Sequence, residues 1–108
     1  MAKIKTSKIR QSAKGEECQI RIPGYCTGLD EQTVLCHLGG AGMALKRLDH
    51  EAAYGCNGCH EVIDGKVRTE FTQEEIKCWF YDGVMRTQKI LIRKGLITIE
   101  GLTLKWTA

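Results

Sequence analysis

The chain has 108 residues, six cysteines and a formal net charge of +3 at neutral pH. Its length corresponds to one small domain, and no apolar run approaches the ~20 residues that a membrane-spanning helix requires. The N-terminus is basic but lacks the apolar segment of a secretory signal, so a cytosolic location without a membrane partner is expected. In the cytosol, cysteine pairs are more typical of metal sites than of disulfides. An exported protein with three disulfides is the less favoured alternative.

Residues 1–15 are predicted to form a basic N-terminal arm, mobile or partly helical, ahead of a single domain over residues 16–108. Five basic residues precede the first acidic one in this arm: Lys3, Lys5, Lys8, Arg10 and Lys14. Such an arm suits contact with phosphates and the release of counterions from nucleic acid. A solubilising tail explains the same charges equally well.

Two strands are expected in the first half of the domain. Residues 18–22 alternate between polar and apolar side chains, and Pro23-Gly24 then forces a turn. Residues 33–38 are rich in residues that favour strands. They run into the glycine-rich segment 39–42, which predicts a loop.

Two helices are expected after this loop. A short one spans residues 56–64 and ends at Gly65. A long one begins with a capping box, in which Thr72 is followed three residues later by Glu75. Apolar residues at helical spacing continue this helix up to Gly95.

The end of the chain is predicted to form a β-hairpin. Residues 96–99 and 102–106 are its two strands, with the turn near Glu100-Gly101. Together the expected strands and helices indicate a small α+β domain with a long C-terminal helix and a terminal hairpin.

Four cysteines have the spacing of a structural zinc site. Cys56 and Cys59 are separated by two residues, which lets both thiolates reach one ion at the start of a helix. Cys18 and Cys26 flank the Pro23-Gly24 turn, which folds the chain back between them. Two such pairs predict a closed tetrahedral site of four sulfur atoms, with no open position for catalysis.

The other cysteines leave alternatives open. Cys36 competes as a zinc ligand, and His60 is a possible replacement for one of the four thiols. Cys78 stands beside Trp79 in the long helix. We therefore expect Cys78 to be a buried and unreactive thiol.

Two histidines and an aspartate are candidate catalytic residues. His37 ends the second expected strand, His60 directly follows Cys59, and Asp49-His50 lies between them. Metal-assisted cleavage of a phosphodiester needs a divalent ion to neutralise the phosphate and a base such as neutral imidazole to activate water. Taken singly, each histidine is also explained as a packed or solvent-exposed residue with no catalytic role.

At these residues the sequence resembles the YbcO-like family, small prophage-encoded proteins assigned as nucleases and related to the HNH, or ββα-metal, class. The matching segments occur in order between about residues 12 and 97. They are Glu17 to Cys26, Val34-Leu35-Cys36-His37, Lys46 with Asp49, Cys56-x-x-Cys59-His60-x-x-Ile63-Asp64, and Met85-Arg86-Thr87-Gln88 leading to Gly95.

The resemblance implies a treble-clef-like hairpin and helix held by zinc, with a second metal site beside it. In the HNH pattern His37 would be the general base and His60 a ligand of a catalytic Mg²⁺ or Mn²⁺. Asp49 would be a second ligand or an orienting group. Many HNH enzymes have an aspartate where this chain has Cys36, a poor ligand for a hard cation. Three alternatives follow: Asp49 or Asp64 supplies the missing charge, the metal binds weakly, or the site is inactive. For Asp64, a simple role at the end of the helix is slightly favoured.

Basic residues outside the arm are candidate contacts for nucleic acid. Arg86, Lys89 and Arg93 have the spacing of one helix face, with Lys94 following. Lys46 and Arg47 follow the glycine-rich segment. Contacts to the phosphate backbone would give affinity without sequence preference. Solvated surface charges explain both groups nearly as well.

These features together predict a metal-dependent DNA endonuclease of HNH-like type that acts in phage or prophage recombination. A homodimer would suit cleavage of both strands. A non-catalytic, zinc-stapled DNA-binding module and a zinc-stapled protein-interaction module are the alternatives, because one fold can host all three functions.

Overall fold

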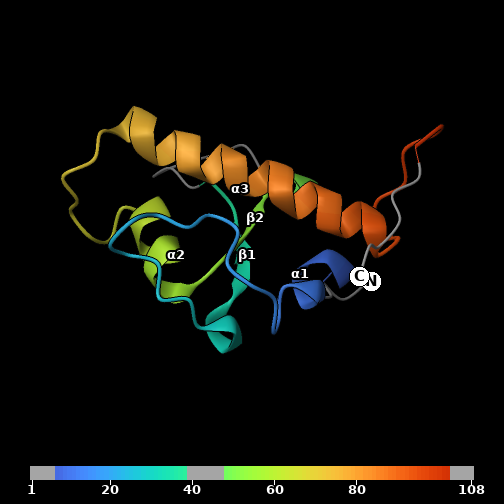
Figure 1. Ribbon diagram of the computed structural model, residues 1–108, viewed down its shortest axis with the longest axis horizontal. Helices are drawn as coiled ribbons and strands as arrows, with labels where there is room; N and C mark the ends of the chain where they lie inside the picture. Colours follow the sequence, from blue (N-terminus) through green and yellow to red (C-terminus); the bar gives the residue numbers. More distant parts are fainter. Residues whose placement is uncertain (1–6, 39–47, 103–108) are drawn as a thin grey trace, which may run out of the picture.

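The computed structural model describes residues 7–38 and 48–102. Its long C-terminal helix lies across a two-stranded sheet, and two shorter helices flank the sheet on the same side of the long helix (Figure 1). This arrangement is a small α+β fold, as predicted. In the part of the chain that the structure describes, no helix is long and apolar enough to span a membrane. The elements are α1 (Lys8–Ser12), η1 (Asp30–Gln32), β1 (Val34–Cys36), η2 (Asp49–Glu51), β2 (Ala53–Gly55), α2 (Asn57–Ile63) and α3 (Gln73–Arg93), where η denotes a 3₁₀-helix.

The sheet pairs β1 with β2 in antiparallel register, with Leu35 opposite Tyr54. The strand predicted at residues 33–38 is confirmed over β1, but the strand predicted at residues 18–22 is wrong. Arg21 interrupts that segment because its φ of 61° lies in the left-handed region, which an extended strand cannot contain. The second strand is β2, whose three residues are all buried and so show no alternation in the sequence.

The boundaries of α3 follow from its capping residues. The backbone N–H of Glu75 donates to Thr72 Oγ1 at 3.1 Å, and the backbone N–H of Thr72 donates to Glu75 Oε1 at 2.8 Å. At the other end Gly95 has a φ of 76°, and the N–H of Leu96 donates to the carbonyl of Leu91 at 2.9 Å. Gly65 ends α2 in the same way, with a φ of 76°. Both glycine stops are therefore confirmed.

One face of α3 contributes side chains to two buried clusters. Ile76, Phe80 and Val84 pack into a cluster that contains the buried cysteines. Leu91 packs with Ala13 and Tyr54 in a second cluster. Full burial of each large apolar side chain stabilises the fold by about 1.5–3 kcal/mol. The helix thereby links the N-terminal segment to the cysteine site.

Residues 7–15, the described part of the expected basic arm, pack against the rest of the protein together with Glu16. The hydroxyl groups of Ser12 and Tyr54 are hydrogen-bonded at 2.6 Å, and Ala13 is fully buried. Lys94, after α3, forms an ion pair with Glu16 at 2.6 Å. Helix α1 is therefore fixed to β2 and to the end of α3.

The predicted terminal hairpin is only partly within the described residues. Ile99 and Leu102 form an antiparallel bridge, and Gly101 has the φ of 82° that a tight turn requires. The remainder of the second predicted strand, residues 103–106, lies outside the described residues.

Candidate metal centre and histidine site

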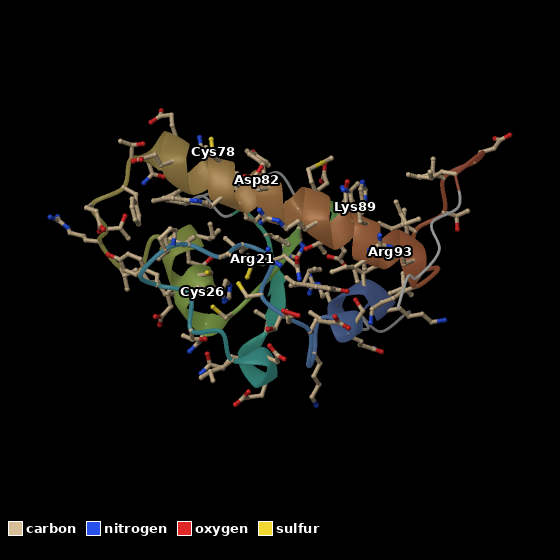
Figure 2. All side chains as sticks on the ribbon, in the orientation of Figure 1. Arg21, Cys26, Cys78, Asp82, Lys89 and Arg93 are labelled. Carbon is tan, nitrogen blue, oxygen red and sulfur yellow. The ribbon has the colours of Figure 1, made fainter. Side chains whose placement is uncertain are left out.

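The structure brings together the four cysteines that the spacing singled out. The Sγ atoms of Cys18, Cys26, Cys56 and Cys59 all lie within 4.8 Å of one another. They gather between α2 and the segment that carries Arg21 and Cys26 (Figure 2). Cys56 is the N-cap of α2, and Cys59 lies in its first turn.

The close approach of the two cysteine segments depends on Gly58. A Cβ atom at this position would lie 1.8 Å from the carbonyl oxygen of Tyr25, which is impossible. Cys26 follows Tyr25 directly and reaches the site from a turn closed by its own N–H, which donates to the carbonyl of Ile22 at 3.0 Å. The absence of a side chain at Gly58 therefore lets this turn pack on α2.

The cysteine geometry fits a tetrahedral metal ion of the size of zinc. The Sγ atoms of Cys18 and Cys59 are 3.6 Å apart, and those of Cys26 and Cys56 are 3.7 Å apart. Four sulfur atoms bonded to zinc at about 2.3 Å have neighbours about 3.8 Å apart. The remaining sulfur pairs lie within 4.8 Å, so the four residues can hold an ion such as zinc after small side-chain shifts.

Backbone donors stabilise the thiolate forms that a metal requires. The N–H of Ile22 donates to Cys59 Sγ at 3.4 Å, and the N–H of Thr27 donates to Cys56 Sγ at 3.2 Å. The hydrogen bond with Cys59 lowers the pKa of Cys18 to about 4, against the effect of burial. Burial and the nearby Cys18 raise the pKa of Cys26 to about 11. Four thiolates this close together, three of them buried, therefore need a cation, because their mutual repulsion otherwise keeps some of them protonated.

The two remaining cysteines lie outside this cluster. Cys36 is fully buried, and desolvation raises the pKa of its thiol. Cys78 is exposed on α3, so the expectation that it is buried is wrong (Figure 2). Its position on α3 falls on the face opposite the apolar stripe, although Trp79, its neighbour, packs edge-on against Phe71 with ring centroids 4.6 Å apart.

A second candidate site is formed by His37 and Asp49. His37 directly follows β1, and Asp49 begins η2 shortly before β2, so the antiparallel pairing of the strands brings the two together. His37 Nε2 lies 3.0 Å from Asp49 Oδ1, and each side chain retains about a fifth of its exposure. The imidazole is thus oriented by a carboxylate and still accessible to solvent.

Two residues of the N-terminal segment complete the surroundings of Asp49. Ser7 Oγ donates to Asp49 Oδ2 at 2.5 Å, and Arg10 Nε donates to Asp49 Oδ1 at 3.3 Å. Partial burial acts to raise the pKa of Asp49, but the hydrogen bonds from Ser7, His37 and Arg10 outweigh it and lower the pKa. Arg10 was expected only as a basic residue of the arm and Ser7 not at all, because no local signal pairs them with a residue about 40 positions away.

His60 has a carboxylate partner of its own. Its Nε2 lies 3.3 Å from Asp64 Oδ2, one turn further along α2. Within residues 7–38 and 48–102, the four cysteines are the only group of three or more potential ligands close enough to share one ion. A catalytic metal at His60 with Asp49 therefore stays a prediction.

The predicted nucleic-acid contacts are in different environments. Lys89 is exposed on the outer edge of α3 (Figure 2). Arg86 is half-buried and donates to the carbonyl of Gln19 at 2.7 Å, so it also joins α3 to the cysteine segment. Arg93 is partly buried as well. Lys46 and Arg47 lie outside the described residues.

Comparison with known proteins assigns the chain to a family. A family model described as "Putative nuclease YbcO" matches residues 7–96. "Putative nuclease YbcO" of Escherichia coli K12 and "Putative nuclease ybcO" of Enterobacteria phage 82 are each 40% identical over 93 residues, which cover 82% of this chain and 95% of the relative.

A solved structure agrees with this assignment. It is described as "Structure of a putative bacteriophage protein from Escherichia coli str. K-12 substr. MG1655". Its sequence is 38% identical, the TM-score is 0.66, and the match covers 82% of this chain and all of the other. The family model spans both the cysteine cluster and the His37–Asp49 pair. This chain therefore belongs to the YbcO family.

Proposed function

We propose that this protein is a metal-dependent DNA endonuclease of HNH type that hydrolyses phosphodiester bonds. Its relatives carry the name "putative nuclease", and they come from Escherichia coli and a phage. The order β1, β2, α2 agrees with the ββα arrangement of HNH enzymes. We assign this activity to the processing or recombination of phage or prophage DNA in the bacterial cytoplasm, and the phage origin of one relative supports this setting.

The His37–Asp49 pair is the observation that carries this proposal. Asp49 stays ionised because hydrogen bonds lower its pKa, so it accepts the Nε2–H of His37. That hydrogen bond selects the neutral tautomer with a lone pair on Nδ1. Nδ1 of His37 then removes a proton from the attacking water, as a general base does.

Asp49 suits the orienting role better than the role of a metal ligand. Both of its oxygens already accept hydrogen bonds, Oδ1 from His37 and Arg10 and Oδ2 from Ser7. His60 and Asp64 on α2 are the residues that would hold Mg²⁺ or Mn²⁺. When bound, such an ion would neutralise charge on the phosphate and stabilise the leaving oxygen.

In this proposal the four-cysteine site has a structural and not a catalytic role. A zinc ion held by four thiolates has no open position, so it would fix the segment between Cys18 and Cys26 to α2 and take no part in the reaction. Cys59 is followed directly by His60, and zinc at Cys59 would therefore also fix the start of the helix that carries His60.

Nicking of supercoiled plasmid in added Mg²⁺ or Mn²⁺ tests the proposal. We expect the wild type to nick, and His37→Ala to lose about 10²- to 10⁴-fold in rate. His50→Ala is the matched control, because His50 is exposed and only its backbone carbonyl accepts a hydrogen bond, from Gln88 at 2.7 Å. All three proteins should have equal zinc content and helicity.

Two outcomes would overturn the proposal. Equal nicking by His37→Ala and the wild type would remove His37 from the reaction. Salt-sensitive DNA binding without nicking would favour the non-catalytic binding module. Cys36 is the specific reason to weigh that second candidate, because it occupies the position where many HNH enzymes carry a metal-binding aspartate.

A further inference from the structure

A groove opens beside His37, on the side of the sheet where α1 lies. Its volume is about 560 Å³, and α1, η1 and β1 contribute its walls. His37 stands at the end of β1, so the groove leads along this strand to the proposed base. The lining residues are Arg10, Gln11, Lys14, Glu31, Thr33, Val34, Leu35 and His37.

The two faces of the groove differ in chemistry. Arg10 and Lys14 place two cations on the wall formed by the α1 segment, and Glu31 is the single acidic residue of the lining. Val34 and Leu35 supply an apolar surface from β1, and Val34 is 43% exposed although it is apolar. Cations beside an apolar surface match the two components of a nucleic-acid backbone, the charged phosphate and the less polar sugar.

The cations of this wall are held by a fixed element. Ser12, between Arg10 and Lys14 in the chain, is hydrogen-bonded to the buried hydroxyl of Tyr54 at 2.6 Å. Ala13 is fully buried, and Glu16 is paired with Lys94. Because α1 is anchored, Arg10 and Lys14 lose less conformational freedom on meeting a phosphate than they would in a free arm.

Arg10 also connects the groove to the proposed catalytic pair. Its Nε donates to Asp49, while its side chain is still 53% exposed. A guanidinium carries five N–H donors in one plane, so a single arginine can contact Asp49 with one edge and a phosphate with another. A phosphate at this point would lie beside His37.

We propose that this groove binds the sugar-phosphate backbone of one DNA strand, with Arg10 and Lys14 on a phosphate next to the one that is cleaved. This inference rests on the proposed nuclease function and adds α1 to the substrate site. A groove of about 560 Å³ has room for the sugar-phosphate backbone of one strand. A single-stranded oligonucleotide is therefore the most direct probe of this contact.

The test compares two lysines of the same segment. Lys14 lines the groove, whereas Lys8 is exposed on α1 outside the lining. Lys14→Gln and Lys8→Gln remove the same charge from neighbouring positions. Binding of a fluorescein-labelled single-stranded oligonucleotide is measured by anisotropy over a range of NaCl concentrations, without added divalent metal, alongside plasmid nicking.

We expect Lys14→Gln to reduce the slope of log K against log salt by about 0.7, the value for one lost phosphate contact on a single strand. We expect Lys8→Gln to leave this slope at the wild-type value. In nicking, Lys14→Gln should raise KM with little change in kcat, because Lys14 binds the substrate away from the reacting atoms.

The possible outcomes distinguish a failure of the groove proposal from a failure of the nuclease proposal. If the wild type nicks DNA while Lys14→Gln and Lys8→Gln behave alike, the groove is not the strand site and the nuclease proposal stands. If the wild type neither binds nor nicks any DNA, both proposals are wrong. Unequal zinc content or helicity between the two variants is excluded beforehand by metal analysis and circular dichroism.

Discussion

His37 Nε2 lies 3.0 Å from Asp49 Oδ1, across the segment that joins β1 to η2. The two residues are 12 positions apart in the chain. Asp49 is held in turn by Ser7 and Arg10 from the N-terminal segment. The orientation of His37 thus depends on three separate parts of the chain.

Asp49→Asn is expected to lower nicking about 10²- to 10⁴-fold while the protein stays folded at neutral pH. The amide cannot hold His37 in the same tautomer as a carboxylate does, since its NH₂ group donates where the carboxylate only accepts. Plasmid nicking with matched zinc content measures the effect. Wild-type activity in Asp49→Asn would remove the orienting role.

The same substitution should change how stability depends on pH. The folded pKa of Asp49 is lowered, so its contribution to stability is fully present above about pH 4, the pKa of an unfolded aspartate. It is lost as the pH falls through the lower, folded pKa. Urea denaturation measures the free energy of unfolding of the wild type and of Asp49→Asn. The difference between these two free energies should therefore become smaller below about pH 4. Loss of metal in acid affects both proteins alike and therefore does not change this difference. A difference in free energy of unfolding that stayed constant with pH would contradict the prediction.

Cys59→Ser is expected to abolish binding of one zinc per chain and to unfold the domain. Cys59 is fully buried and lies 3.6 Å from Cys18, so its loss opens the site within the core. Binding of a structural zinc contributes about 10–16 kcal/mol in small domains, more than such a fold can lose. Metal analysis and circular dichroism measure both effects. Cys36→Ser and Cys78→Ser are the controls, and loss of zinc from either would revise the ligand set.

Gly58→Ala in α2 and Gly83→Ala in α3 each add one methyl group to a helix. We expect only the first to lower the stability of the protein. At Gly58 the new Cβ would meet the carbonyl of Tyr25 at 1.8 Å, so we expect destabilisation of about 3 kcal/mol or more and weaker zinc binding. At Gly83 the nearest atoms are 3.1 Å away, and the gain in helix propensity of about 1 kcal/mol offsets the tight contact. Urea denaturation of both variants checks the contrast, and equal stabilities would contradict it.

Thr33→Val and Thr87→Val should have opposite effects on stability. Thr33 Oγ1 is buried and has no hydrogen-bond partner among the described residues, so its replacement should stabilise the fold by about 1 kcal/mol. Thr87 Oγ1 accepts the buried N–H of Tyr54 at 3.0 Å, so its replacement should cost about 1–3 kcal/mol. Thermal and urea unfolding measure both changes. Loss of stability in Thr33→Val would show that its hydroxyl has a partner after all.

The sequence predicted the parts of this protein whose signals are local. The start of α3 follows from its capping box, and the ends of α2 and α3 follow from the glycines just after them. The four clustered cysteines were identified from two short spacings, because a tetrahedral ion demands two compact pairs. The strand β2 was missed since a short, fully buried strand has no alternating pattern.

The tertiary structure alone decided the remaining relationships. Asp49 meets Ser7 and Arg10, and Ser12 meets Tyr54, across about 40 residues of chain. Cys78 is exposed because of its place on the α3 helix, although its neighbours in the chain suggested burial. Contacts of this kind depend on how α3 packs over the sheet and on where α1 docks, and both are fixed by burial of side chains distant in the chain. A capping box or a cysteine pair needs only its nearest residues, whereas the orientation of His37 needs the whole fold.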